Sequence, residues 1–310
     1  MTGLTTDIRY LTRSEIDQDK WDKCICNASN GLIYGRSFYL DAMAENWSAL
    51  VQGDYQKVMP LTWKKKFGFH YLYQPHFTKT LGVFGTDNLP FEISPFLGAI
   101  PGKFSFWDFD LNDNNIVNSG NNKLVFYDRT NYFLPLKEEY ENIQLRYRRL
   151  AKRMIKKGIE NELHIVRGEL PSRIIDLYLK DYSIRHRTIP VSDYNRLKQC
   201  THWAFNNYLA KTYLALSPSG EPLAYYIILS DDSYVYSLLG GSNGEGKNKG
   251  AFYLLTDAII RDYSGTEKIF RFEGSDIPGI AFFDELFGPL KIRYQHLVMN
   301  NLPFPFNLFK

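Results

Sequence analysis

The stretch from Leu223 to Ser275 constrains the fold more than any other part of the chain. Two runs rich in β-branched and aromatic residues, Leu223–Leu229 and Ser233–Leu239, predict paired strands. A glycine-rich loop, an amphipathic helix and a further strand that leads to Ser275 follow them. This order predicts a sheet with a helix packed against it.

The loop between these strands and the helix, residues 240–250, combines several glycines with Lys247 and Lys249. Free backbone N–H groups, a helix N-terminus and lysine side chains all favour a bound anion. The strand after the helix then brings Arg271, Glu273 and Ser275 to a neighbouring edge. We therefore predict a functional site here.

Strand and helix signals alternate along the rest of the chain, with antiparallel hairpins mixed in. A chain of 310 residues is long for one core, and its length predicts about two domains. An Asn-rich, turn-forming segment at 111–122 places the boundary nearby. We predict an α/β (α+β) fold with two domains, residues 1–135 and 136–310, each built on a mixed sheet.

The charge balance does not favour a nucleic-acid-binding domain, because 37 Lys and Arg against 34 Asp and Glu leave a net charge of only +3. The local exception is a predicted helix at 137–157, whose C-terminal half is rich in Arg and Lys. We interpret most of these cations as a solvated face that complements the helix dipole, although a phosphate-rich ligand would be attracted to it.

Three cysteines in a chain of this length do not form a disulfide framework, which favours a reducing compartment. The N-terminus has no apolar signal region, and no apolar run reaches membrane-spanning length. The histidines are scattered, with neither HExxH nor Gly-x-Ser-x-Gly spacing. We expect a cytoplasmic protein with no metal, no membrane span and no DNA partner.

Two segments resemble a known family. Residues 270–275, Phe-Arg-Phe-Glu-Gly-Ser, followed by Pro278-Gly279-Ile280 and Phe287-Gly288, resemble a segment of the acyl-CoA N-acyltransferase (GNAT) fold. Tyr34–Tyr39 resembles an early helix start in the same family. The doubling of the pattern is similar to the FemAB-like transferases, so the resemblance implies two tandem GNAT-like domains, each a mixed, largely antiparallel sheet flanked by helices.

The resemblance also implies a donor. GNAT enzymes carry Arg/Gln-x-x-Gly-x-Gly/Ala before a helix, and the nearest match here begins at Lys247 and keeps Gly250 and Ala251 but not the second glycine spacing. Acyl-CoA is the implied co-substrate and aminoacyl-tRNA the alternative, which the lack of a long heptad insertion disfavours. The implied donor-binding residues are Leu238, Gly240, Lys247, Asn248, Lys249, Gly250 and Ala251.

Acyl transfer to an amine needs a held donor, a deprotonated amine and a stabilised oxyanion. Glu273 is the first candidate for a base or for a group that orients the amine; a structural pair with Arg271 or Lys247 is the equal alternative. Ser275 is a catalytic candidate that could instead cap the next helix, and Tyr236 is a candidate acid that could instead be a packing residue.

Acceptor binding is expected in a cleft between the domains. The candidate residues are Arg36, Tyr39, Tyr73, Gln74 and Arg271. The leading hypothesis is an N-acyltransferase or aminoacyltransferase that acts on a small-molecule or peptide amine by direct attack, without a covalent enzyme intermediate. The alternative is a catalytically inactive GNAT-fold module that binds a sugar, a peptide or a phosphate-bearing ligand.

Overall fold

The computed structural model describes residues 7–87, 89–118, 123–182, 189–274 and 276–308. The chain forms two compact units, one made of Met1–Arg129 with Arg293–Lys310 and the other of Thr130–Ile292. The chain first passes between them close to the expected boundary at residue 135. It then returns, so the final segment lies with the first unit, whereas the sequence assigned it to the second half. Each unit is described by itself below.

The first unit contains a sheet in the order β1-β2-β3-β4-β7-β15. Neighbouring strands are antiparallel except β4 and β7, which are parallel, and the short β5 pairs with β3. Its elements are β1 (Ile8–Thr12), η1 (Arg13–Glu15), α1 (Gln18–Asn27), η2 (Ile33–Gly35), α2 (Ser37–Met43), β2 (Asn46–Gln52), β3 (Lys57–Lys66), β4 (Phe69–Tyr73), β5 (Phe84–Gly85), β6 (Phe91–Glu92), α3 (Ser94–Gly98), β7 (Phe104–Asp110), β8 (Asn115–Ile116), η3 (Phe306–Leu308) and parts of β9 (Leu124–Pro135) and β15 (Leu290–Asn300).

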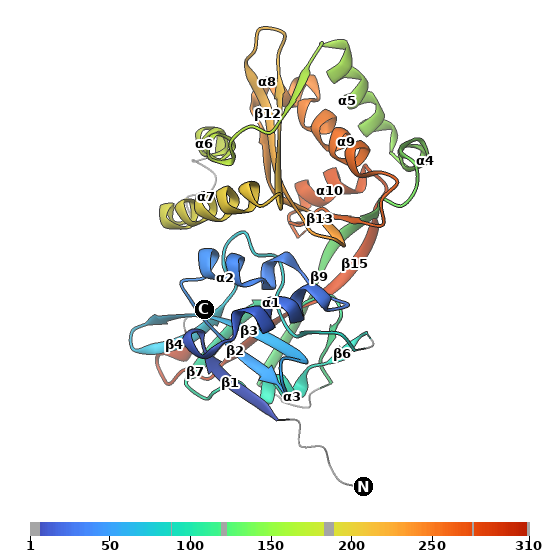
Figure 1. Cartoon of the computed structure of the whole chain (residues 1–310). Helices are drawn as coiled ribbons and strands as arrows, with labels where there is room; N and C mark the ends of the chain where they lie inside the picture. The colour runs from blue at the N-terminus through green and yellow to red at the C-terminus, as the bar shows by residue number, and fades with distance from the viewer. Residues whose placement is uncertain (1–6, 88, 119–122, 183–188, 275, 309–310) are drawn as a thin grey trace. The chain divides into compact units, whose positions relative to one another are not determined.

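Helices cover both faces of this sheet (Figure 1). Asp17 caps α1 by accepting from the Lys20 N–H at 3.1 Å, and the helix buries Trp21 and Ile25, as the sequence predicted. On the opposite face, Phe96 of α3 joins a core cluster with residues of β2, β3, β4 and β7. Apolar side chains on both faces explain why the central strands are nearly continuous in hydrophobic residues.

The second unit repeats this design with the order β10-β11-β12-β13-β14-β9. Again only one neighbouring pair, β13 with β14, is parallel. Its elements are α4 (Tyr140–Leu145), α5 (Arg149–Glu160), β10 (His164–Arg167), α6 (Pro171–Tyr182), α7 (Val191–Asn206), β11 (Ala210–Leu216), β12 (Pro222–Ser230), β13 (Tyr234–Ser242), α8 (Gly244–Lys249), α9 (Ala251–Tyr263), β14 (Ile269–Arg271) and α10 (Pro278–Glu285), with the remaining parts of β9 and β15.

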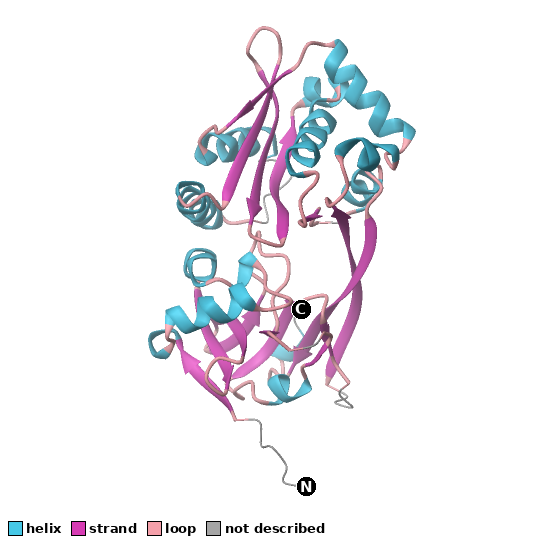
Figure 2. Ribbon diagram, turned by 45° about the vertical axis from the view of Figure 1, so that its right-hand side comes forward, coloured by secondary structure: helices cyan, strands magenta, loops and turns pink. Residues whose placement is uncertain are grey.

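Two layers of helices enclose this second sheet, with α5 and α9 on one face and α6 and α7 on the other (Figures 1 and 2). Alternate residues of β12, such as Tyr226 and Ile228, join the core cluster under α9. Close packing of α5 against α9 requires a glycine, since a Cβ at Gly158 would lie 3.2 Å from Leu254. The sequence predicts helices at 172–185 and 193–209, and both are present as α6 and α7; residues 183–185 of the first prediction lie outside the described residues.

The two sheets share one sequence of pairings, with three antiparallel steps, one parallel step and one antiparallel step. This repetition confirms the predicted fold class, two mixed and largely antiparallel sheets flanked by helices. One predicted element is wrong in detail. The helix expected at 137–157 is two helices, α4 and α5, because the chain turns at Arg146–Arg148.

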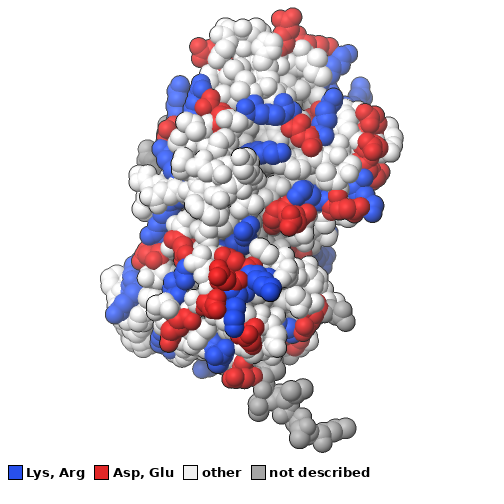
Figure 3. Space-filling model, viewed as in Figure 1, with Lys and Arg blue, Asp and Glu red and all other residues white. Residues whose placement is uncertain are grey.

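Positive and negative side chains are interspersed over the face of each unit shown in Figure 3, as the small net charge suggests. Among the helices of the described ranges, none combines the length and the apolar character that a membrane span requires.

Candidate functional site

The parallel strands of the second unit separate at one end. Pairing between β13 and β14 stops at Tyr236 and Arg271, whereas β13 continues to Ser242 along β12. Within the described residues, the final part of β13 therefore has a strand partner on one side only. A register shift around Leu238 adds a bulge here, because Ile227 faces Leu239 while Ile228 faces Ser237. Exposed backbone groups of a strand can bind an extended ligand.

The segment after β13 is not the open loop that the sequence predicted. Gly240–Ser242 belong to β13, and Gly244–Lys249 form the short helix α8. The Asn243 side chain accepts the Gly246 N–H at 2.7 Å, so this donor is already satisfied. The prediction of converging free N–H groups is therefore wrong for most of the segment. The sequence signal was ambiguous because glycines occur in loops, caps and close contacts alike.

The remaining anion-attracting feature is the N-terminus of α9. Gly250 has φ +76°, ends α8 and begins α9, and the first turn of α9 has neither a capping side chain nor an acidic residue. The unsatisfied N–H groups of such a turn carry a partial positive charge. Ala251, the first residue of α9, is buried.

Cations surround this helix start unequally. Lys249 pairs with Glu245 at 2.8 Å, whereas Lys247 has no ion pair in the described parts of the chain and lies 5.6 Å from the centre of the Tyr182 ring. Asn248, next to it, is exposed. Burial raises the pKa of Tyr253, and Arg153 of α5 opposes that rise, which places the guanidinium near this hydroxyl. Lys247 and Arg153 thus supply uncompensated positive charge beside α9.

Gly240 and Gly241 have a packing role. A Cβ on Gly240 would lie 2.8 Å from the Phe252 ring, and one on Gly241 would lie 2.6 Å from the Tyr182 ring. Glycine at these two positions is therefore explained by the aromatic rings that cover the strand. Gly240 was predicted as a donor-binding residue. A glycine can contribute only its backbone to such a site, and this role stays a prediction.

A buried network follows β14. The Arg271 side chain is 1% exposed and Glu273 is 8% exposed. Arg271 Nε donates to Glu273 Oε1 at 3.1 Å, and Asn131 Nδ2 donates to Glu273 Oε2 at 3.0 Å. Arg271 also lies 4.3 Å from the Phe133 ring centre. The structure therefore contains the Arg271–Glu273 pair that the sequence offered as the alternative to a base.

Glu273 is held in an unusual backbone conformation, with φ +55°, and Gly274 follows with φ +78°. Such a conformation is costly for a residue with a side chain and persists only when its surroundings hold it in place. Here the backbone N–H of Glu273 donates to Asn131 Oδ1 at 3.1 Å. The turn carries the chain away from β13 where the two strands separate.

The other two catalytic candidates lie in different settings. Tyr236 is fully buried, and its hydroxyl donates to Asp231 Oδ2 at 2.5 Å. Asp231 is part of the β12–β13 turn, where burial raises its pKa and the Tyr236 hydrogen bond opposes that rise. An acid role for Tyr236 stays a prediction. Ser275 lies outside the described residues.

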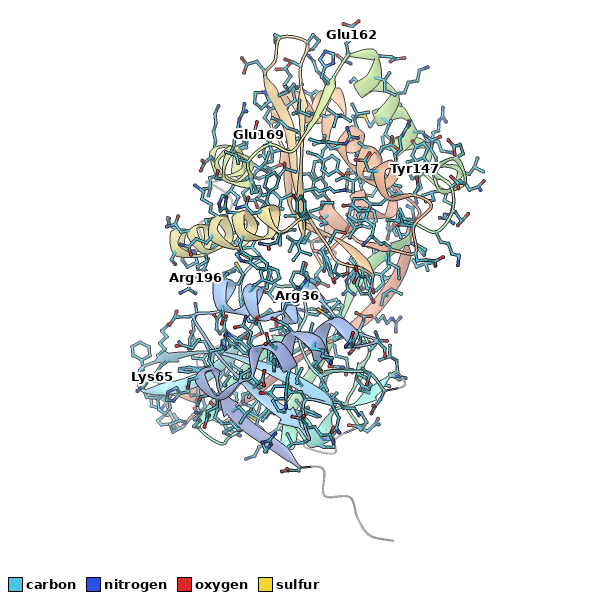
Figure 4. All side chains as sticks on the ribbon, in the orientation of Figure 1. Arg36, Lys65, Tyr147, Glu162, Glu169 and Arg196 are labelled. Carbon is cyan, nitrogen blue, oxygen red and sulfur yellow. The ribbon has the colours of Figure 1, made fainter. Side chains whose placement is uncertain are left out.

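Arg36 is the one charged residue among the acceptor candidates of the first unit. Its Nε is buried without a hydrogen-bond partner, and the guanidinium lies 5.4 Å from the Phe38 ring centre without an ion pair to any described residue. An unsatisfied buried N–H is costly and is a site where an anionic ligand would be stabilised. Figure 4 labels Arg36 beside α2.

The remaining acceptor candidates already make internal contacts. The hydroxyl of Tyr39 donates to the Phe77 carbonyl at 2.5 Å, and the hydroxyl of Tyr73 accepts the Glu45 N–H at 2.9 Å. Gln74 bridges Asp110 and Thr78 through its side-chain amide. The structure brings Tyr73 and Gln74 together at the end of β4, while Arg271 lies in the other unit.

The sequence reading missed a charged cluster at the end of β7. His296 Nδ1 lies 2.9 Å from Asp110 Oδ1, its Nε2 lies 3.3 Å from Asp108 Oδ1, and Arg129 donates to both Asp110 oxygens at 2.9 Å. The signal was the spacing of the two aspartates, because residues two apart on a strand share a face. The position of His296 beside these aspartates could not be predicted, because it lies 186 residues after Asp110 in the chain.

The register makes the two units comparable at this point. Tyr73 pairs with Asp108 and Tyr236 with Arg271 as the last pairs of the parallel steps. Two residues later, each strand delivers a buried carboxylate, Asp110 in one unit and Glu273 in the other. Each carboxylate accepts from an arginine and from a second side chain. The tandem design therefore extends to a polar cluster at each strand opening.

The cluster of the first unit makes stability depend on pH. The Asp108 and Asp110 carboxylates accept hydrogen bonds from the imidazole, and these bonds raise the pKa of His296 to about 9. A raised pKa means that the protonated form stabilises the fold below pH 6.5 and that this contribution disappears as pH rises through 9. We expect His296→Gln to lose about 2 kcal/mol at pH 6 and much less above pH 9. Denaturant unfolding of both proteins across this range checks it, and a constant difference would contradict it.

Comparison with known proteins supports the fold. No protein-family model matches the sequence, and no curated protein sequence matches it. Among solved structures, FemX superposes with a TM-score of 0.68 at 12% identity, over 97% of this chain and 99% of that one. A tandem GNAT protein from the clavulanic acid biosynthesis pathway gives 0.52 at 9% identity, over 96% and 99%. A conserved protein of unknown function from Bacteroides thetaiotaomicron gives 0.61 at 9% identity, over 95% and 99%.

At sequence identities of 9% to 12%, the likeness to these structures shows the fold alone. The chain shares its fold with FemX and with the tandem GNAT protein, and the resemblance predicted from residues 270–288 is confirmed at the level of the fold.

Proposed function

We propose that the protein is an acyl- or aminoacyltransferase whose second unit holds the donor. The observation that carries the proposal is the opening between β13 and β14, where a bulged strand with one free edge leads to the uncapped start of α9. An extended acyl arm can bind along such a strand while its phosphates reach the helix N-terminus. Acyl-CoA and aminoacyl-tRNA both fit this description, since each joins an acyl group to an anionic carrier.

The proposed reaction is direct. The amine nitrogen attacks the donor carbonyl carbon and the carbon–sulfur or carbon–oxygen bond breaks. The carrier leaves as a thiolate or alkoxide, which takes up the proton that the attacking amine loses. We assign stabilisation of the oxyanion to backbone N–H groups near Leu238, and the register shift of β13 at this point supports the assignment. We assign Glu273 the role of orienting the amine, because Arg271 and Asn131 hold both oxygens of the Glu273 carboxylate in fixed positions.

The first unit, taken by itself, is proposed to offer a residue that binds an anionic group. Arg36 is the supporting observation, because its half-buried guanidinium has no compensating charge among the described residues. The other acceptor candidates of this unit, Tyr39, Tyr73 and Gln74, all make hydrogen bonds within the protein and add nothing about the ligand.

Two lysines of α8 provide a matched test of the donor site. We expect Lys247→Ala to weaken donor binding about five- to tenfold, because it removes a charge that no acidic residue neutralises. Lys249→Ala removes a charge already paired with Glu245 and is expected to change binding less than about twofold. Calorimetric titration with acetyl-CoA, and filter binding with aminoacyl-tRNA, measure both variants.

The same proteins are then assayed for transfer to a panel of amines, with mass spectrometry of the products. Equal effects of the two lysine variants on whichever donor binds would contradict the proposed site. Tight donor binding without transfer to any amine would favour the inactive binding module. That alternative has its own support, because the Glu273 carboxylate is already paired in a buried network.

A further inference from the structure

The first unit displays a patch of apolar and basic side chains that no part of the proposed reaction uses. It lies at the β3–β4 hairpin, at the residue before β7 and in the segment after β15. We define this hairpin-tail patch by Lys65, Lys66, Phe67, Lys103, Phe304 and Leu308. Figure 4 shows Lys65 on the hairpin at the edge of this unit.

The three apolar members are strongly exposed. Phe67 is 75% exposed, Phe304 79% and Leu308 70%. The two chain segments are held together by aromatic contacts, since the Phe306 ring lies 5.2 Å from Phe69 and 6.3 Å from Phe67. These contacts hold the segment that carries Phe304 and Leu308 against the hairpin that carries Phe67, so the three exposed side chains lie on two adjoining segments.

Phe67 breaks a local rule of sequence and structure. Lys66 pairs with Phe69, so Phe67 and Gly68 form a two-residue turn, with φ values of +51° and +87°. A turn with both φ angles positive strongly prefers Asn-Gly. Phenylalanine at this position is strained, and its ring is not buried by the fold. Residues that oppose local preference without a packing benefit commonly serve function.

The charges around the exposed rings have one sign. Lys65, Lys66 and Lys103 have no ion pair to any described residue, and Lys66 Nζ lies 5.4 Å from the Phe67 ring centre. Burial lowers the pKa of His70, and Lys65 and Lys103 lower it further, so both lysines lie near that imidazole; the Lys103 ammonium also donates to the Tyr10 hydroxyl at 2.9 Å. Only Lys64, deeper in the hairpin, is paired, with Glu45 at 3.5 Å.

We propose that the hairpin-tail patch binds the surface of an anionic membrane. Phenyl and leucyl side chains insert into the boundary between headgroups and acyl chains, and lysines beside them attract anionic lipid headgroups. The patch suits lipid better than single-stranded RNA. Single-stranded RNA binding combines aromatic stacking with a basic groove that follows the backbone. Leu308 cannot stack, and the hairpin tip is a turn at the end of two central strands.

Vesicle flotation with the full chain tests the proposal. We expect binding to vesicles that contain phosphatidylglycerol, little binding to pure phosphatidylcholine, and release at high salt. Phe67→Asn is expected to reduce binding about fivefold or more while leaving stability equal or higher, because Asn suits the turn. Lys65→Glu is expected to reduce binding at least about fivefold.

Controls are available in the same chain. Tyr208 is also an exposed aromatic residue with positive φ, at 92% exposure and +59°, and Tyr208→Asn should leave vesicle binding unchanged. Lys23→Glu is the matched charge reversal on exposed α1. Unchanged binding by Phe67→Asn, or equal binding to neutral and anionic vesicles, would overturn the proposal. Binding of an RNA oligonucleotide that Phe67→Asn abolishes, without vesicle binding, would overturn it as well.

Discussion

Replacing Arg271 with Met is expected to lower the free energy of unfolding by about 3–5 kcal/mol. The guanidinium is almost fully buried and donates to Glu273 at 3.1 Å. Its removal leaves a buried carboxylate with Asn131 as its remaining side-chain hydrogen-bond donor in the described network. Breaking one member of a buried pair is costly because the other charge stays desolvated. Denaturant unfolding monitored by tryptophan fluorescence measures the loss.

A surface pair serves as the control. Arg148 lies 3.1 Å from Glu285, but both side chains are substantially exposed. Arg148→Met is therefore expected to cost less than about 1 kcal/mol. The double variant Arg271→Met with Glu273→Gln should lose clearly less than the sum of the two single variants, because each single variant leaves one buried charge unpaired and the double variant leaves none. Additive losses would show that the two side chains are not coupled.

The second large effect is expected at Gly250. Gly250→Ala should lower the free energy of unfolding by more than about 2 kcal/mol and abolish donor binding. A Cβ at this position would lie 2.2 Å from the Met154 carbonyl oxygen, and the φ of +76° disfavours any side chain. Relief of the clash must move α9 away from α5. Thermal unfolding and titration with the donor report the two consequences separately.

Gly244→Ala is the matched control for this variant. Gly244 belongs to the same short segment, but a Cβ there meets no atom within 4 Å. We expect its stability to change by less than about 0.5 kcal/mol and donor binding to be retained. A similar loss in both variants would contradict the packing explanation, because the clash and the positive φ occur at Gly250 and not at Gly244.

The elements with strong local signals were predictable from the sequence. Asp17 and the apolar spacing of Trp21 and Ile25 specify α1, and the alternating runs from Leu223 specify β12 and β13. The strands β5, β6 and β8 gave no such signal, because each contains only two residues. Strands of this length depend on their neighbours and not on local preference.

Site residues were harder to predict than elements. The Arg271–Glu273 pair could be proposed because both residues lie on one short stretch. Asn131 and His296 could not, since their partners are 142 and 186 residues away in the chain. The glycines at 240 and 241 show a second limit. A sequence cannot tell a glycine that admits a ligand from one that admits an aromatic ring.

The most direct test of the account is hydrogen exchange of the backbone amides with and without donor. If the opening of the second unit holds the donor, acetyl-CoA or aminoacyl-tRNA should slow exchange in peptides covering 237–242 and 250–254, while peptides covering β4 of the first unit remain unchanged. A donor that binds and protects only the first unit, or leaves 237–254 unprotected, would contradict the proposal that the second unit is the donor site.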